Sequence, residues 1–154
     1  MKITDGTGAG DTPLSAFDAA LFNAGIANYN LVHLSSIIPP GYEPRIEKLN
    51  WNGADDAGSR LYVVIASQTE IEHGKEAWAG LGWVLTEDQS LGLFVEHTGH
   101  SEQEVRDQID YSLKSMILYR KQKFGEIKRH ITGIICQGKP VCALVAAPYK
   151  VEPW

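Results

Sequence analysis

The chain has 154 residues, of which 44% are hydrophobic and 21% are charged, which is enough for one compact domain but short for two. Its formal net charge is -5, so a nucleic-acid partner held by phosphate neutralisation is not expected. No segment approaches the roughly 20 apolar residues that span a bilayer, so no membrane association is expected. Cys136 and Cys142 lie in apolar runs and are expected to be buried free thiols in a reducing cytoplasm.

The first part of the chain predicts a loop, a helix and a strand. Glycine occupies alternate positions in 5–11, which favours an irregular loop there. A helix over 13–24 follows, with Thr12 as its N-cap and Gly25 as its C-terminal cap. Residues 28–38 predict one strand that ends at a pair of prolines, because proline cannot donate to a sheet ladder.

The rest of the chain predicts mainly strands and one further helix. The predicted segments are an irregular connection over 41–58, strands over 60–67, 77–86 and 92–97, a helix from the capping box at Ser101 to about 123, and a closing hairpin of 127–136 with 141–147. The resulting class is α+β, with two helices against mainly antiparallel strands.

Two adjacent serines, Ser35 and Ser36, are the most unusual feature of this plan. They lie within an apolar segment, directly before Ile37, Ile38 and the two prolines. A serine pair near a strand end commonly bonds to neighbouring backbone. The pair therefore indicates no chemistry without further sequence context.

That context is a resemblance carried by three segments. They are Gly10-Asp-Thr-Pro-Leu-Ser-Ala-Phe-Asp-Ala-Ala-Leu-Phe-Asn-Ala-Gly-Ile26, Asn30-Leu-Val-His-Leu-Ser-Ser-Ile-Ile-Pro-Pro-Gly41 and Gly92-Leu-Phe-Val-Glu-His-Thr-Gly99. Together they closely resemble the pyruvoyl-dependent arginine decarboxylases, over nearly the whole chain. The resemblance implies a single domain, 1–154, built as a two-sheet sandwich of mainly antiparallel strands flanked by helices.

The resemblance also implies that the chain cuts itself between Ser35 and Ser36, into a small chain 1–35 and a large chain 36–154. The hydroxyl of Ser36 would attack the carbonyl of Ser35 and form an ester. Elimination and hydrolysis would then convert Ser36 into a pyruvoyl group, the only cofactor expected, without pyridoxal phosphate or a metal. This group would form a Schiff base with the substrate and act as the electron sink for its decarboxylation.

Three further residues receive roles from the family pattern. Asn30 is the expected helper in cleavage, since its side-chain amide can donate a hydrogen bond to an oxyanion. Glu96 follows an apolar run and is the expected acid that returns a proton after carbon dioxide leaves. Asp18 is expected to receive the substrate guanidinium, which a carboxylate can bind through two hydrogen bonds.

The implied reaction converts L-arginine into agmatine, a polyamine precursor. The family pattern implies a homotrimer of cleaved chains with active sites between subunits, so Asp18 and Glu96 are expected to reach one site from different chains. Two alternatives stay open, namely the same chemistry on another amino acid and an uncleaved homologue that serves as a subunit or binding protein. A metal held by Glu96, His97 and His100 is a weaker alternative.

Overall fold

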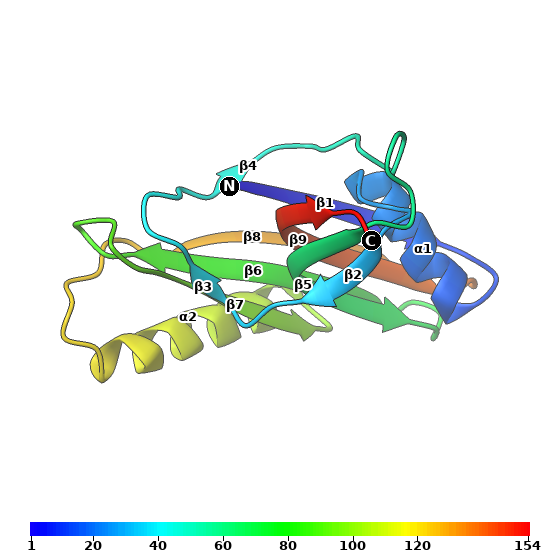
Figure 1. Ribbon diagram of the computed structural model, residues 1–154. Coiled ribbons are helices and arrows are strands. Elements are labelled where there is room, and N and C mark those ends of the chain that lie inside the picture. Colours follow the sequence, from blue (N-terminus) through cyan, green and yellow to red (C-terminus); the bar gives the residue numbers. More distant parts are fainter.

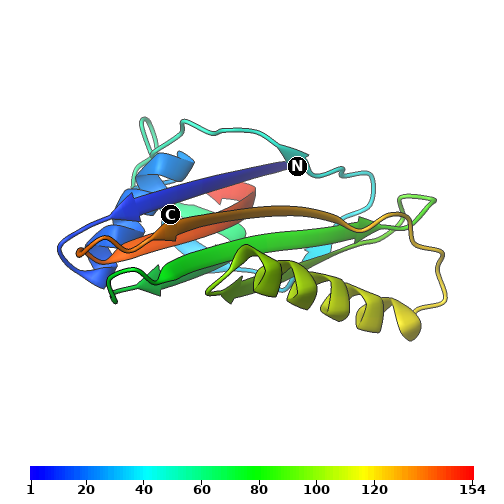
Figure 2. The same cartoon turned by 180° about the vertical axis from the view of Figure 1, so that it is seen from behind.

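Two sheets pack face to face, and one helix covers the outer face of each, in a computed structural model that describes all of residues 1–154 (Figures 1 and 2). The elements in chain order are β1 (Lys2–Ala9), α1 (Pro13–Ala24), β2 (Asn30–His33), β3 (Ile37–Ile38), β4 (Arg45–Ile46), β5 (Arg60–Glu70), β6 (Glu76–Leu85), β7 (Gly92–Gly99), α2 (Glu102–Leu118), β8 (Lys128–Ile135) and β9 (Val141–Glu152).

The five-stranded sheet has the order β2-β5-β9-β1-β4, and the four-stranded sheet has the order β3-β7-β6-β8. Only the β1–β4 and β2–β5 pairings are parallel. Helix α1 packs on β1, β5 and β9, and α2 packs on β6, β7 and β8. The predicted α+β sandwich of mainly antiparallel strands is therefore confirmed.

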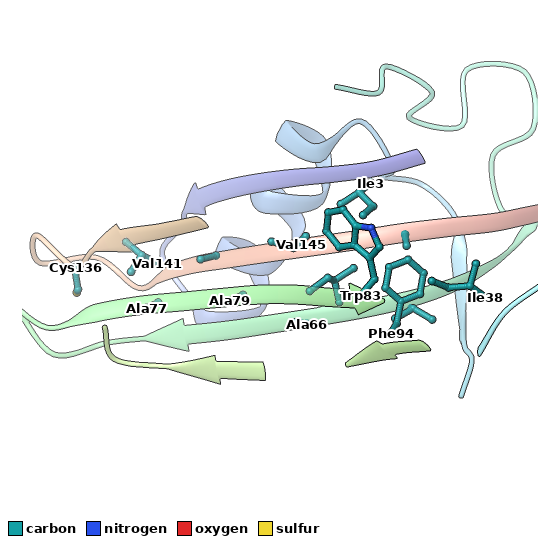
Figure 3. Close-up of a cluster of buried hydrophobic side chains, with 14 residues drawn as sticks. Ile3, Ile38, Ala66, Ala77, Ala79, Trp83, Phe94, Cys136, Val141 and Val145 are labelled. Atoms are coloured by element: carbon teal, nitrogen blue, oxygen red, sulfur yellow. The ribbon is translucent and has the colours of Figure 1, made fainter. Parts of the chain in front are cut away.

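The side chains of each strand alternate between the two faces of its sheet, and the inward-facing ones are mostly apolar. They form the core between the two sheets. In Figure 3 the indole of Trp83 lies beside the ring of Phe94, with Ile3 and Ile38 around them. The two rings meet edge to face with centroids 6.3 Å apart. Ile38 is fully buried here, which fixes the position of the short strand β3.

The prediction of a loop over 5–11 is wrong for most of its length, because β1 extends to Ala9 and pairs with β9. The glycines serve close packing instead. A Cβ on Gly6 would lie 2.1 Å from the carbonyl oxygen of Ala20, and one on Gly8 would lie 2.5 Å from the Ala20 nitrogen. Glycine in a strand thus marks the close approach of a helix.

The first helix matches its prediction. The hydroxyl of Thr12 accepts a hydrogen bond from the Ser15 N–H at 3.1 Å, and Gly25 caps the other end with φ 77°. Helix α2 also begins as predicted, with Ser101 accepting from the Glu104 N–H. However, α2 ends at Leu118 and does not reach 123, and the Leu118 side chain is exposed.

Two strand predictions need correction. Residues 28–38 are not one strand, because β2 belongs to the five-stranded sheet and β3 to the four-stranded sheet. Residues 127–136 and 141–147 do not form a hairpin, because β8 pairs with β6 and β9 pairs with β1 and β5. In both places the chain crosses from one sheet to the other. An apolar sequence does not show whether the next strand pairs in the same sheet or in the other one.

The remaining boundaries differ little from prediction. The strands predicted over 60–67, 77–86 and 92–97 correspond to β5, β6 and β7, and the connection 41–58 contains the two-residue strand β4. Cys136 and Cys142 are free and buried, as predicted. Neither helix combines the length and the apolar character that crossing a bilayer requires.

Candidate active site

The serine pair lies where the chain leaves one sheet for the other, between β2 and β3 (Figure 1). The N–H of Leu34 still donates to Val63 of β5 at 3.0 Å. By Ser36 the chain has reached the second sheet, because the N–H of Phe94 in β7 donates to the Ser36 carbonyl at 2.8 Å. Ser35 and Ser36 are thus outside both strands, but backbone bonds hold the chain on either side.

Ser36 and Glu96, separated by 60 positions in sequence, meet in the fold. The Ser36 hydroxyl donates to Oε1 of Glu96 with an Oγ–Oε1 distance of 2.5 Å. Glu96 comes from β7 and is partly buried, and short O–H···O⁻ bonds of this kind are charge-assisted and strong. The structure therefore joins the predicted nucleophile and the predicted acid within one chain.

The carbonyl of Ser35 also has a hydrogen-bond donor. The N–H of Ile37 donates to the Ser35 oxygen at 2.8 Å, which closes a three-residue turn around Ser36. A carbonyl that accepts a hydrogen bond is polarised towards attack, and the same N–H would stabilise an oxyanion on that oxygen. Backbone donors carry no residue-type signal, so this contact was not predicted.

Tyr149 is a further neighbour that the sequence did not indicate. Its hydroxyl donates to the carbonyl of Ile37 at 2.9 Å. Burial, and after it the negative charge of Glu96, raise the pKa of the Tyr149 phenol to about 12. The side chain is therefore a neutral donor at physiological pH. The final strand was predicted to end at 147, so Tyr149 was not placed in any predicted strand.

Asn30 does not contact the serine pair within this chain. It begins β2, and its side-chain amide donates to the Gly58 carbonyl at 2.6 Å. Six positions separate Asn30 from Ser36, and an extended segment of that length spans up to about 20 Å. Within this chain the Asn30 amide thus bonds to Gly58 and not to the Ser35 carbonyl.

Asp18 has no hydrogen bond to Ser36 or Glu96 within this chain. It is exposed on α1, which covers the five-stranded sheet, whereas Glu96 belongs to the four-stranded sheet. None of the cavities of the single chain is lined by Ser36, Glu96 or Asp18. A single chain thus supplies the reacting serine and its carboxylate but no enclosed pocket for a substrate.

The histidines near Glu96 have other partners. Nε2 of His97 lies 2.8 Å from the Ser112 hydroxyl, and burial lowers the pKa of this imidazole. Nδ1 of His100 lies 3.2 Å from the Glu76 carbonyl. No three His, Cys, Asp or Glu side chains gather as a metal site requires. This geometry does not support the metal alternative.

Comparisons with known proteins agree over almost the full length. The family model described as pyruvoyl-dependent arginine decarboxylase matches residues 1–152. The protein of that name from Thermococcus sibiricus is 34% identical over 138 residues, covering 89% of this chain and 85% of its own. The one from Pyrococcus abyssi is 35% identical over 144 residues, covering 91% and 89%. A solved pyruvoyl-dependent histidine decarboxylase is 15% identical, covers 65% of this chain and 57% of its own and has a TM-score of 0.47, too low to add to the comparison.

Proposed function

Because the chain belongs to the pyruvoyl-dependent arginine decarboxylase family, we propose that it cuts itself between Ser35 and Ser36 and then converts L-arginine into agmatine and carbon dioxide. The observation that carries the proposal is the 2.5 Å hydrogen bond between the Ser36 hydroxyl and Glu96. It links a potential nucleophile to a carboxylate that can take its proton, directly beside the peptide bond to be cut.

The cleavage begins with attack of the Ser36 Oγ on the Ser35 carbonyl carbon, while the hydroxyl proton moves to Glu96. The C–N bond of the Ser35–Ser36 peptide then breaks, the nitrogen takes up a proton, and an ester remains. Loss of the Ser36 Hα and cleavage of the Cβ–O bond release the Ser35 carboxylate. Hydrolysis of the resulting dehydroalanine gives the pyruvoyl group and ammonia.

The surroundings of Ser36 fit a pyruvoyl group at this position. When formed, the group supplies an electron sink for the loss of carbon dioxide. The Phe94 N–H holds the carbonyl of residue 36 at 2.8 Å and would orient it after cleavage. Glu96 lies beside the same residue and can hold the proton that the product carbon needs.

We propose that Asp18 and Asn30 enter this site from a neighbouring chain of a homotrimer. Glu96 and Ser36 belong to one chain, so the division of the site between subunits assigns Asp18 to the neighbour. The exposed position of Asp18 leaves its carboxylate free to bind a guanidinium there. The two free, buried cysteines suit a reducing compartment, and we propose a cytoplasmic location.

Asp18→Asn is expected to raise KM for arginine about 10- to 100-fold, because one charged hydrogen-bonding partner of the guanidinium is lost. Cleavage at Ser35–Ser36 should be unaffected, since none of the proposed cleavage steps uses the Asp18 carboxylate. Steady-state kinetics with arginine tests the first expectation, and the mass of the denatured chains tests the second. An unchanged KM would remove Asp18 from the substrate site.

A mixture of two variants tests whether the site is shared between subunits. Asp18→Asn and Glu96→Gln chains, each of low activity alone, are coexpressed in equal amounts. If one residue comes from each of two chains, about a quarter of the sites in random trimers are intact, and activity returns. Without sharing, the mixture is no more active than its components.

The wild-type chain itself distinguishes the proposal from its alternatives. Denaturing mass spectrometry should find 1–35 and 36–154 in place of the intact 17.0 kDa chain, and arginine should release carbon dioxide. An intact chain without activity favours a non-catalytic homologue. Cleavage with turnover of a different amino acid in a substrate panel would retain the chemistry and reassign the substrate.

A further inference from the structure

Tyr149 lies at a β-bulge in β9 and continues the row of side chains, including Val145 and Ala147, that face the core between the sheets. In the pairing of β5 with β9, Val63 is opposite Pro148 and Tyr62 is opposite Lys150, so Tyr149 is an extra residue without a partner. Bulges end regular pairing, and they occur frequently beside active sites. Here the bulge ends the inward-facing row at Tyr149, because the next odd-numbered residue, Val151, faces the core beneath α1.

The Tyr149 hydroxyl bonds to the backbone of the segment that contains the cleavage site. It donates to the Ile37 carbonyl at 2.9 Å, and the N–H of the same residue donates to the Ser35 carbonyl at 2.8 Å. The only strand pairing of this segment is the two-residue strand β3, and prolines that cannot donate follow it. The Phe94 N–H holds the Ser36 carbonyl, which belongs to the same peptide unit as the Ile37 N–H. Tyr149 holds the carbonyl of the next peptide unit, so the backbone is held on both sides of the Ile37 Cα.

We propose that Tyr149 is a positioning residue for self-cleavage, which holds Ile37 so that its N–H stabilises the oxyanion on Ser35. This inference rests on the proposed function. Asn30 of a neighbouring chain could assist at the same oxygen, but the Ile37 N–H is the donor that the chain itself supplies.

The step that Tyr149 supports is the first one. As the Oγ–C bond forms, the electron pair of the Ser35 C=O moves onto its oxygen, and the hydroxyl proton goes to Glu96. An N–H fixed 2.8 Å from that oxygen stabilises the developing charge without rearranging during the reaction. If the loss of the Tyr149 bond let the backbone shift at Ile37, its N–H would move away from the Ser35 oxygen and the attack would slow.

Tyr149→Phe tests the inference, since it removes only the hydroxyl. Tyr62→Phe is the matched control, because its hydroxyl bonds to Glu152 in the same pair of strands and has no contact with the serine pair. Chains are made by cell-free synthesis, and cleavage is followed by mass at a temperature where all three give the same circular dichroism spectrum. We expect Tyr149→Phe to cleave about tenfold more slowly than the wild type and Tyr62→Phe to match the wild type.

Hydroxylamine identifies the affected step, because it cuts an accumulated ester but not a peptide. The slow Tyr149→Phe chain should resist it, as expected when ester formation is the slow step. Rapid cutting by hydroxylamine would show that a later step is slowed and would overturn the inference. Equal cleavage of all three chains would overturn the role of Tyr149 and leave the proposed function standing, whereas absence of cleavage in all three would overturn both.

Discussion

Ser36→Ala is expected to remain a single 17.0 kDa chain and to release no carbon dioxide from arginine. The substitution removes the oxygen that attacks the Ser35 carbonyl, and no other side chain forms a hydrogen bond with Glu96. The pyruvoyl group would then never form, and activity should fall to background. Denaturing mass spectrometry measures the first effect, and release of labelled carbon dioxide measures the second.

Ser35→Ala is the matched control for this experiment. It changes the neighbouring serine but keeps the Ser36 hydroxyl and the Ser35 backbone carbonyl that the mechanism uses. This variant should still be cut at the same bond and should retain activity. If Ser36→Ala were processed normally, the proposed origin of the reactive group would be refuted.

Glu96→Gln should lower kcat for arginine by about 10²- to 10⁴-fold, the range expected when a positioned acid is lost. The glutamine can still bond to the Ser36 hydroxyl, so cleavage should continue, although without a carboxylate to accept the proton it should be slower. The measurement uses the cleaved form of the variant, isolated before assay, so that slow processing does not imitate low turnover.

Glu87→Gln, at an exposed position after β6, provides a charge-matched control that should leave kcat unchanged. A cleaved Glu96→Gln variant with wild-type kcat would mean that another group protonates the product carbon. In that case the contact with Ser36 would serve cleavage alone. The two functions of Glu96 are thus separable by experiment.

Local sequence signals predicted both ends of α1 and the start of α2 well, but they predicted the end of α2 and the crossovers poorly. Thr12 and Gly25 determine the ends of α1 through their own side-chain and backbone chemistry, and such effects act within a few residues. The split at Ser35 and Ser36 and the crossing after β8 depend on which distant strand offers a partner. The sequence of a short apolar strand does not show which sheet it joins or which strands it pairs with.

The candidate site likewise contains residues that were predicted from the sequence and groups that only the structure revealed. Ser36 and Glu96 were predicted from the family pattern, and their contact joins the segment directly before β3 to β7. The Ile37 N–H and the Tyr149 hydroxyl came only from the structure. A backbone donor carries no sequence signal, and the place of Tyr149 beside Ile37 depends on how β9 pairs with β5 and on how the two sheets pack. Local sequence patterns do not predict contacts that depend on how distant strands pair and pack.

The position of the cut at a crossover has a consequence for the mature protein. Strand β1 lies between β9 and β4, and β2 lies beside β5, so residues 1–35 contribute their strands entirely to the sheet that residues 36–154 complete. After cleavage, fragment 1–35 would therefore remain bound to fragment 36–154 through the hydrogen bonds of this sheet. Once processed, the protein should melt at a temperature that rises with its concentration, as expected for a complex whose parts can dissociate.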